Sequence, residues 1–228
     1  MQTEPDQPLQ REREQIAQEF DEDACDFCDR YQRKGLSASS RKLLDLIIER
    51  GLEGKTAAEL GCGAGGFSIE LLKKGAENIV GFDLSPQMIK SANELAKSSG
   101  FETRAKFQIG NAAAVEIPDS DIIIMDKVLC CYSDWKPLLS RAITSNPSSI
   151  GFIVPRDEGV AKLPFRVGVR IGNYFQKRKG KILFYLHPLN LVDRTLHDSG
   201  FTQRRKQGSR LWLVFLYSRP RQNKQQEP

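Results

Sequence analysis

A glycine-rich loop is the feature of this sequence that most constrains its fold. It reads Glu59-Leu60-Gly61-Cys62-Gly63-Ala64-Gly65-Gly66. The apolar stretch Thr56–Leu60 predicts a short strand, and the periodic segment Phe67–Lys74 predicts a helix. Glycines suit a backbone that turns sharply and lets a ligand approach within contact distance. The loop also fits the dinucleotide fingerprint. It therefore predicts a nucleotide-type site without deciding the cofactor.

Two carboxylates close to this loop indicate which cofactor it binds. Glu59 ends the strand just before the glycines, where dinucleotide-binding enzymes normally carry an apolar residue. A carboxylate at that point repels a pyrophosphate, but it suits a positive charge such as the ammonium of a methionine moiety. Asp83 closes the next predicted strand, Asn78–Phe82, where a carboxylate can accept both ribose hydroxyls. The two acids favour S-adenosylmethionine over a dinucleotide.

These motifs resemble those of a known enzyme family. The Glu-Leu-Gly-Cys-Gly-Ala-Gly loop, the acid after the second strand and the run from Asp83 to Met88 are similar to class I S-adenosylmethionine-dependent methyltransferases. The match is closest to the small enzymes grouped as methyltransferase types 11 and 12, and it covers roughly residues 41–218. The resemblance implies an enzyme that uses S-adenosylmethionine and releases S-adenosylhomocysteine.

The resemblance also implies roles for individual residues. Glu59 and the loop backbone would hold the methionine end, Asp83 the ribose, and Leu84 and Met88 the adenine. Asn111 stands where the family usually has an aspartate, and its amide oxygen can still accept from the adenine amino group. The full set of expected cofactor-binding residues is Glu59, Gly61, Cys62, Gly63, Gly65, Asp83, Leu84, Met88, Asn111, Ala112, Asp126 and Lys127.

Strand-like and helix-like segments alternate along the chain, which argues for a parallel sheet covered on both faces. Two final strand-like stretches, 201–206 and 211–218, flank a turn and predict an antiparallel hairpin. We therefore predict an α/β protein with a Rossmann-like, seven-stranded mixed sheet and helices on both faces. This is the class I methyltransferase fold.

The predicted domain organisation is simple. Residues 1–20 are polar and predict a flexible tail or a loosely attached helix, and residues 220–228 predict a disordered tail. A single methyltransferase domain occupies residues 21–219. Within it, residues 155–187 exceed an ordinary strand-to-helix connection and predict a helical lid, aromatic on one side and cationic on the other. With the helix after it, this segment is similar to magnesium-protoporphyrin methyltransferases.

The sequence defines the catalytic residues less clearly than the cofactor site. Methyl transfer from a sulfonium needs alignment of the acceptor above all, and a base only if the acceptor must lose a proton. Tyr132 and His187 are the candidate catalytic residues, and Arg156 could open toward the same cleft. Cys130-Cys131 is a weaker candidate, because cysteine is also a small core residue. The fourth strand is not followed by Asn-Pro-Pro-Tyr or Asp-Pro-Pro-Tyr, which enzymes that methylate planar amino groups usually carry there.

Charge and cysteine usage limit the partners. The net charge is +5, and basic stretches at 177–181 and 204–210 leave an RNA acceptor as a less favoured alternative to a small molecule. A protein that binds the cofactor without catalysis is the third hypothesis. The lone Cys25-x-x-Cys28 lacks a clear second ligand pair, so no metal is expected. No signal-like or membrane-spanning segment is apparent, which predicts a cytoplasmic protein. Its oligomeric state is not predicted.

Overall fold

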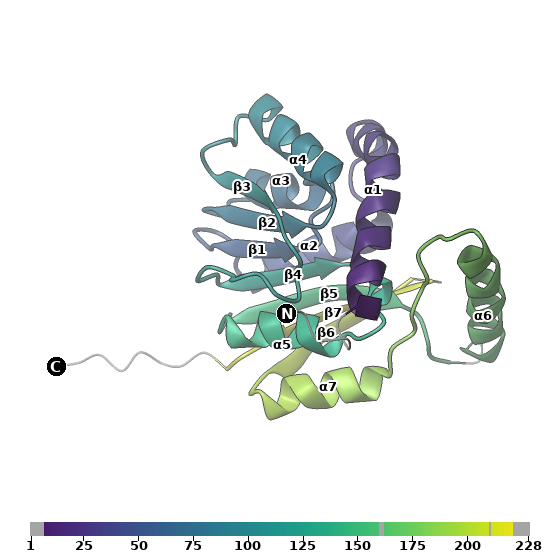
Figure 1. The fold of residues 1–228 in the computed structure, drawn as a ribbon. Coiled ribbons are helices and arrows are strands. Elements are labelled where there is room, and N and C mark those ends of the chain that lie inside the picture. The colour runs from purple at the N-terminus through teal and green to yellow at the C-terminus, as the bar shows by residue number, and fades with distance from the viewer. Residues whose placement is uncertain (1–6, 160–161, 210, 221–228) are drawn as a thin grey trace.

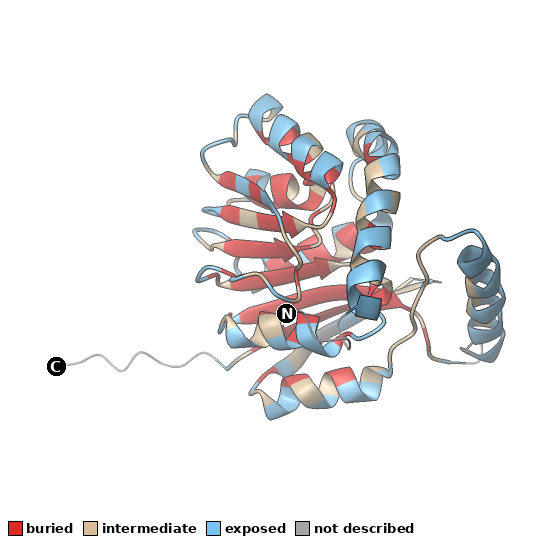
Figure 2. Cartoon of the chain, viewed as in Figure 1, coloured by how far each residue is buried: buried red, intermediate tan, exposed pale blue. Residues whose placement is uncertain are grey.

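The run Ile122-Ile123-Ile124 illustrates how the sheet is covered. All three side chains are buried, and they alternate between two apolar layers, one on each face of the sheet. The structure is a computed structural model that describes residues 7–159, 162–209 and 211–220. Figure 2 shows the buried residues concentrated in the strands. The expectation of strands buried on both faces is confirmed.

Seven strands form one mixed sheet in the order β3-β2-β1-β4-β5-β7-β6. The neighbouring pairs from β3 to β5 are parallel, whereas β7 is antiparallel to both β5 and β6. The predicted fold class, with its C-terminal hairpin, is therefore confirmed. The strands are β1 (Ala57–Leu60), β2 (Ile79–Asp83), β3 (Ala105–Ile109), β4 (Ile122–Asp126), β5 (Ser149–Pro155), β6 (Thr202–Gly208) and β7 (Trp212–Ser218).

Helices cover the sheet on both faces (Figure 1). Buried side chains of α2 (Ala38–Arg50), α3 (Gly66–Lys73) and α4 (Pro86–Ser98) form one apolar layer. Those of α5 (Lys136–Thr144) and α7 (Leu189–Asp198) belong to the other. A short 3-10 helix, η2 (Leu129–Cys131), follows β4.

Of the two alternatives predicted for residues 1–20, a flexible tail or an attached helix, the described part of this segment is a helix. Residues 7–20 are the first half of a 28-residue helix, α1 (Gln7–Lys34). Ile16 and Ala24 of α1 are buried, and Ala24 packs with Ala64 and Met88. This tertiary packing stabilises a helix whose own composition is strongly polar. Residues 1–6 and 221–228 lie outside the described residues, as does most of the predicted C-terminal tail.

The predicted lid contains a helix, but its position differs from the expectation. Helix α6 (Lys162–Arg178) projects from the body of the molecule in Figure 1. None of its residues lines the cavity at the glycine loop. Instead, α1 lies across the carboxyl ends of the parallel strands, where ligands bind in sheets of this kind (Figure 1).

Candidate functional site

A cavity of about 560 Å³ lies at the carboxyl ends of β1, β2 and β4. The glycine loop, Asp83, and the residues that follow β4 form its floor, and α1 closes it from above. Nearly all of the predicted cofactor-binding residues line it: Glu59, Gly61, Cys62, Gly63, Asp83, Leu84, Met88, Ala112, Asp126 and Lys127. The structure thus brings together side chains that are far apart in the sequence.

The glycine loop is shaped by its backbone conformation. Gly61 and Gly63 have φ values of 72° and 51°, in the left-handed region that favours glycine. A Cβ on Gly61 would also lie 2.4 Å from a methyl carbon of Val128, so the crossing of the loop and the β4 connection requires glycine there. Gly65 and Ala64 continue the loop into the start of α3, and Gly65 is its N-cap.

Asp83 holds the loop and still faces the cavity. Its Oδ2 accepts a hydrogen bond of 2.8 Å from the Gly63 N–H, and its Oδ1 accepts one of 3.0 Å from the Ser85 N–H. Burial raises the pKa of Asp83, although these two N–H groups oppose the shift. The carboxylate therefore fixes the spacing of the first two site motifs, and its remaining lone pairs can accept from a ligand.

Glu59 is a buried acid with one side-chain partner. Its carboxylate accepts a hydrogen bond of 2.5 Å from the Ser68 hydroxyl, and only 2% of the residue is exposed. Burial raises the pKa of Glu59 to about 8, and the nearby carboxylates of Asp126 and Asp83 add to the shift. Ser68, which the sequence did not suggest as a site residue, is therefore the group that orients Glu59.

The part of the cavity around Met88, where adenine was expected, is apolar. Met88 is fully buried, and Leu84 and Ala112 line the same region. Asn111 differs from its expected role, because it is not among the cavity-lining residues. Its Oδ1 accepts a hydrogen bond of 3.1 Å from the Ala113 N–H, so the amide oxygen that was expected to meet adenine is used within its own turn.

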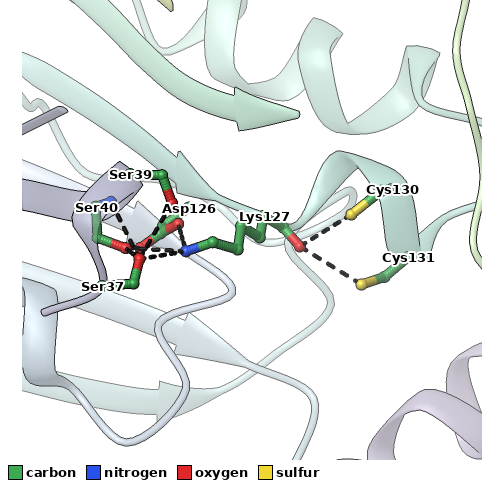
Figure 3. Close-up of polar contacts among 7 residues, drawn as sticks. All are labelled: Ser37, Ser39, Ser40, Asp126, Lys127, Cys130 and Cys131. Carbon is green, nitrogen blue, oxygen red and sulfur yellow. Dashed lines mark hydrogen bonds and ion pairs between the residues drawn. The ribbon is translucent and has the colours of Figure 1, made fainter. Parts of the chain in front are cut away.

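A polar network connects the end of β4 with the start of α2 (Figure 3). Lys127 Nζ donates to Asp126 at 2.8 Å, to Ser40 at 2.9 Å and to Ser37 at 3.1 Å. The Ser40 hydroxyl in turn donates to Asp126 at 2.5 Å. Lys127 has a φ of 62°, which is uncommon for a residue with a side chain and marks backbone strain at the cavity.

The two candidate catalytic residues occupy different places. Tyr132 is buried and lines the cavity, with its hydroxyl 3.5 Å from Asn111 Oδ1. His187 lies outside the cavity lining, and its Nε2 is 2.8 Å from the Leu129 carbonyl oxygen. Burial lowers the pKa of His187, which favours a neutral ring. This geometry does not support the predicted catalytic role of His187; the imidazole anchors the η2 turn. Arg156 instead bonds the Ser209 carbonyl.

Helix α1 contributes site residues that the sequence did not reveal. Ile16, Phe20, Phe27, Arg30 and Tyr31 line the cavity from above. Trp212 adds a further aromatic ring from β7. The cover is tied down by polar contacts, because the Asp21 carboxylate accepts from the Ser85 hydroxyl and from the Gln87 N–H at the start of α4.

A second cavity, of about 690 Å³, adjoins the first. The two share Ile16 and Cys131 in their linings. Apolar side chains of α1 and of the segment before α7 line the second cavity, together with two cations, Arg11 and Lys177, and one acid, Glu12, whose carboxylate accepts from the Ser133 N–H and hydroxyl. Tyr185 also lines it. A molecule in this cavity would approach the first cavity at its Cys131–Ile16 side.

Comparison with known proteins places the chain among methyltransferases. Residues 52–160 match a family model described as a methyltransferase domain. The ribosomal protein L11 methyltransferase of Enterobacter sp. (strain 638) is 32% identical over 89 residues, which cover 39% of this chain and 30% of that protein. The chain therefore matches only about a third of the length of such curated relatives.

Solved structures share the fold across most of the chain. Magnesium protoporphyrin IX methyltransferase from Synechocystis PCC 6803, with bound S-adenosylmethionine, has a TM-score of 0.66 at 17% identity, covering 92% of this chain and 97% of that one. The cyclase SpnF has a TM-score of 0.60 at 15% identity, covering 78% and 81%. At these identities the similarity establishes the fold and not the substrate. Together with the family match, it confirms the resemblance inferred from the sequence.

Proposed function

Given that the chain contains a class I S-adenosylmethionine-dependent methyltransferase domain, we propose that it transfers the methyl group of S-adenosylmethionine to a small anionic acceptor. The observation that carries the cofactor assignment is the charge of the cavity. Glu59, Asp83 and Asp126 all line it, and both aspartates raise the pKa of Glu59; of the two cations in the lining, Lys127 is paired with Asp126 and Arg30 stacks on the Phe27 ring. Mutually repelling carboxylates are stabilised by a cationic ligand. The ammonium and sulfonium of S-adenosylmethionine supply such charges.

In this proposal each end of the cofactor has a partner. Glu59 accepts from the ammonium, Asp83 from the ribose hydroxyls, and Met88 packs on the adenine. The acceptor's nucleophilic atom attacks the methyl carbon in line with the breaking bond to sulfur. The electron pair of that bond stays on sulfur, giving S-adenosylhomocysteine. The protein's task is alignment and exclusion of water.

Tyr132 is proposed to orient the acceptor rather than to take its proton. Burial and the nearby Asp83 carboxylate raise the pKa of its hydroxyl, so the neutral phenol persists at physiological pH. A neutral hydroxyl donates a hydrogen bond and is a weak base. An acceptor that must lose a proton would therefore release it to another group or to solvent.

The small-molecule acceptor is inferred from the way the site is enclosed. Helix α1 covers the cofactor cavity, so a macromolecule would have to displace it. The adjoining cavity has apolar side chains and two cations, Arg11 and Lys177, in its wall, while the acid Glu12 accepts hydrogen bonds from Ser133; this suits a planar or lipid-like acceptor carrying a carboxylate or phosphate. The alternative RNA acceptor relied in part on 204–210, a stretch that includes residue 210, outside the described residues.

The test is methyl transfer from tritiated S-adenosylmethionine in a cell extract, followed by separation of the label by size and charge. We expect label in a small, organic-extractable, anionic product. Arg11→Gln should reduce that labelling, whereas Arg33→Gln, on the same helix but outside both cavity linings, should not. Label in protein or RNA would overturn the acceptor proposal. Cofactor binding without label in any fraction would favour the non-catalytic hypothesis.

A further inference from the structure

Helix α6 stands apart from the rest of the described chain. In Figure 1 it projects beyond the sheet, and Figure 2 shows it coloured almost entirely as exposed or intermediate. Among its residues with described side chains, 163–178, none is buried. A 17-residue helix that contributes nothing to the core calls for a role outside the fold.

The orientation of α6 is fixed by contacts on one face. Phe165, Val169 and Asn173, four residues apart, are its half-buried positions. The Asn173 amide donates to the Phe184 carbonyl at 2.8 Å and accepts from the Phe184 N–H at 2.9 Å. Arg166 forms a two-bond ion pair with the buried Asp157, at 2.6 and 2.7 Å. The opposite face therefore points away from the protein.

That outward face is apolar. Its large side chains fall within a third of the helix circumference at the ordinary helical spacing. They are strongly exposed: Leu163 71%, Val167 48%, Ile171 54%, Tyr174 54% and Phe175 55%. A contiguous exposed row of this size is unusual on a soluble surface and indicates an interaction site.

Positive charge borders the apolar face. Residues 159–187 contain seven lysines and arginines and no acidic residue. Arg170 is exposed beside the apolar row, and Arg178 stacks its guanidinium over the Tyr174 ring at 4.7 Å. Lys179 and Gly180 follow the end of the helix. Long basic side chains next to an apolar stripe can reach lipid headgroups while their stems stay in apolar surroundings.

We propose that α6 docks on an anionic lipid membrane, with its apolar face in the interface and its cations on the headgroups. An exposed apolar row bordered by positive charge is the pattern of an interfacial helix; Arg166 and Lys181 are paired with Asp157 and Glu22, and Arg170 and Lys179 remain to face the headgroups. RNA would match the charge but leave the apolar row in water. A second copy of the chain would place like charges together. No described helix is both long and apolar enough to cross a bilayer, so the docking is peripheral.

The experiment is flotation of the whole protein with vesicles of phosphatidylcholine alone or with 30% phosphatidylglycerol. We expect binding to the anionic vesicles, at least ten-fold weaker binding to the neutral ones, and release by salt. Val167→Ser with Ile171→Ser should abolish flotation, and Arg170→Gln with Lys179→Gln should weaken it about ten-fold or more. Leu191→Ser, an exposed leucine of α7, should not change it.

The fold of each variant is checked by cofactor binding, since α6 lies outside that cavity. Equal binding to neutral and anionic vesicles, or no binding to either, would overturn the proposal. So would flotation that survives the Val167/Ile171 changes. If those changes instead abolish self-association or RNA binding measured without lipid, the face belongs to a second copy or to RNA, and the membrane proposal is wrong.

Discussion

Tyr31 of α1 packs on Gly66 at the start of α3 so closely that a Cβ on residue 66 would lie 2.7 Å from the tyrosine ring. The Tyr31 hydroxyl donates a hydrogen bond of 2.7 Å to Glu70, one turn further along α3. The cover over the cofactor cavity therefore rests on a glycine and an acid of the helix that follows the loop.

Gly66→Ala is expected to push Tyr31 away and loosen α1. Because φ of Gly66 is not in the left-handed region, the effect should come from Tyr31 and not from backbone strain. We expect S-adenosylmethionine affinity to fall about ten-fold, or ~1.4 kcal/mol, by calorimetric titration. Gly168→Ala, where a new methyl meets nothing within 4 Å, should leave affinity unchanged. Unchanged affinity in Gly66→Ala would contradict the packing argument.

Asp83→Ala should remove most cofactor binding while the protein stays folded. The variant would lack the carboxylate that is proposed to accept from the ribose hydroxyls, and hydrogen bonds to charged groups contribute roughly 1.5–3 kcal/mol each. A loss of about 100-fold in affinity is expected by calorimetry, with the circular dichroism spectrum retained. Asp45→Ala, an exposed acid of α2, is the matched control. Near-equal affinity in the two variants would overturn the ribose assignment.

Glu59 should make stability depend on pH. Its folded pKa of about 8 lies above the ordinary value of 4.5. Between these values the folded protein holds a proton that the unfolded chain has released, so stability falls as pH rises, by up to about 1.4 kcal/mol per unit. Glu59→Gln resembles the neutral acid. Urea unfolding at pH 5 and at pH 7.5 should therefore show that the unfolding free energy of this variant changes less with pH than that of the native protein. An equal change of unfolding free energy with pH in the native protein and in Glu59→Gln would rule out a protonated Glu59 in the folded state.

Cofactor binding should show the opposite trend with pH. The ammonium of S-adenosylmethionine stabilises the ionised form of Glu59, so binding expels its proton below pH 8. Affinity should therefore rise between pH 6 and 8. Calorimetry in buffers of different ionisation enthalpy should detect proton release in the native protein and much less in Glu59→Gln.

Because the backbone of Lys127 is strained, we expect glycine to be more stable than alanine at this position, which is the reverse of the order within a helix. Lys127→Ala and Lys127→Gly both lose the contacts to Asp126, Ser40 and Ser37, but only glycine relieves a φ of 62°. The glycine variant should therefore be about 1 kcal/mol more stable than the alanine variant in urea unfolding. At Lys90, an exposed residue within α4, alanine should be the more stable by a similar amount. If alanine were the more stable residue at both positions, the backbone of Lys127 would not be strained.

Tyr132 and His187 should separate catalysis from folding. Tyr132→Phe removes a hydroxyl inside the cavity and should lower kcat about ten-fold with little change in stability. His187→Ala removes the bond to the Leu129 carbonyl and should cost roughly 1–3 kcal/mol of stability with kcat retained. The reverse pattern would restore His187 as the catalytic residue.

The features predictable from sequence were those encoded locally. Gly61, Gly63 and Asp83 lie at strand ends whose order along the chain fixes where they meet. The apolar runs of the strands likewise fixed the sheet and its terminal hairpin. The sequence predicted that His187 precedes a helix. It did not reveal the path of the preceding segment, and that path directs the imidazole to the backbone carbonyl of Leu129.

Helix α1 shows why the cover escaped prediction. Ile16, Phe20, Ala24, Phe27 and Tyr31 recur at helical spacing, so a signal was present. It was diluted by the many charged residues between them, which lower the mean hydropathy of the segment. These α1 residues form a packed face only because Ala64, Met88 and Gly66 lie against them, and it is the tertiary fold that brings those partners there.

The position of α1 also sets a condition on the timing of the reaction. In the proposed function S-adenosylhomocysteine would lie beneath this helix after each transfer, and we expect its release to require the Asp21 and Tyr31 contacts to separate from α4 and α3. Opening of such covers takes microseconds to milliseconds and often limits turnover. We therefore expect each catalytic cycle to end with a movement of α1, so that the contacts made by residues 7–34 set the rate of product release.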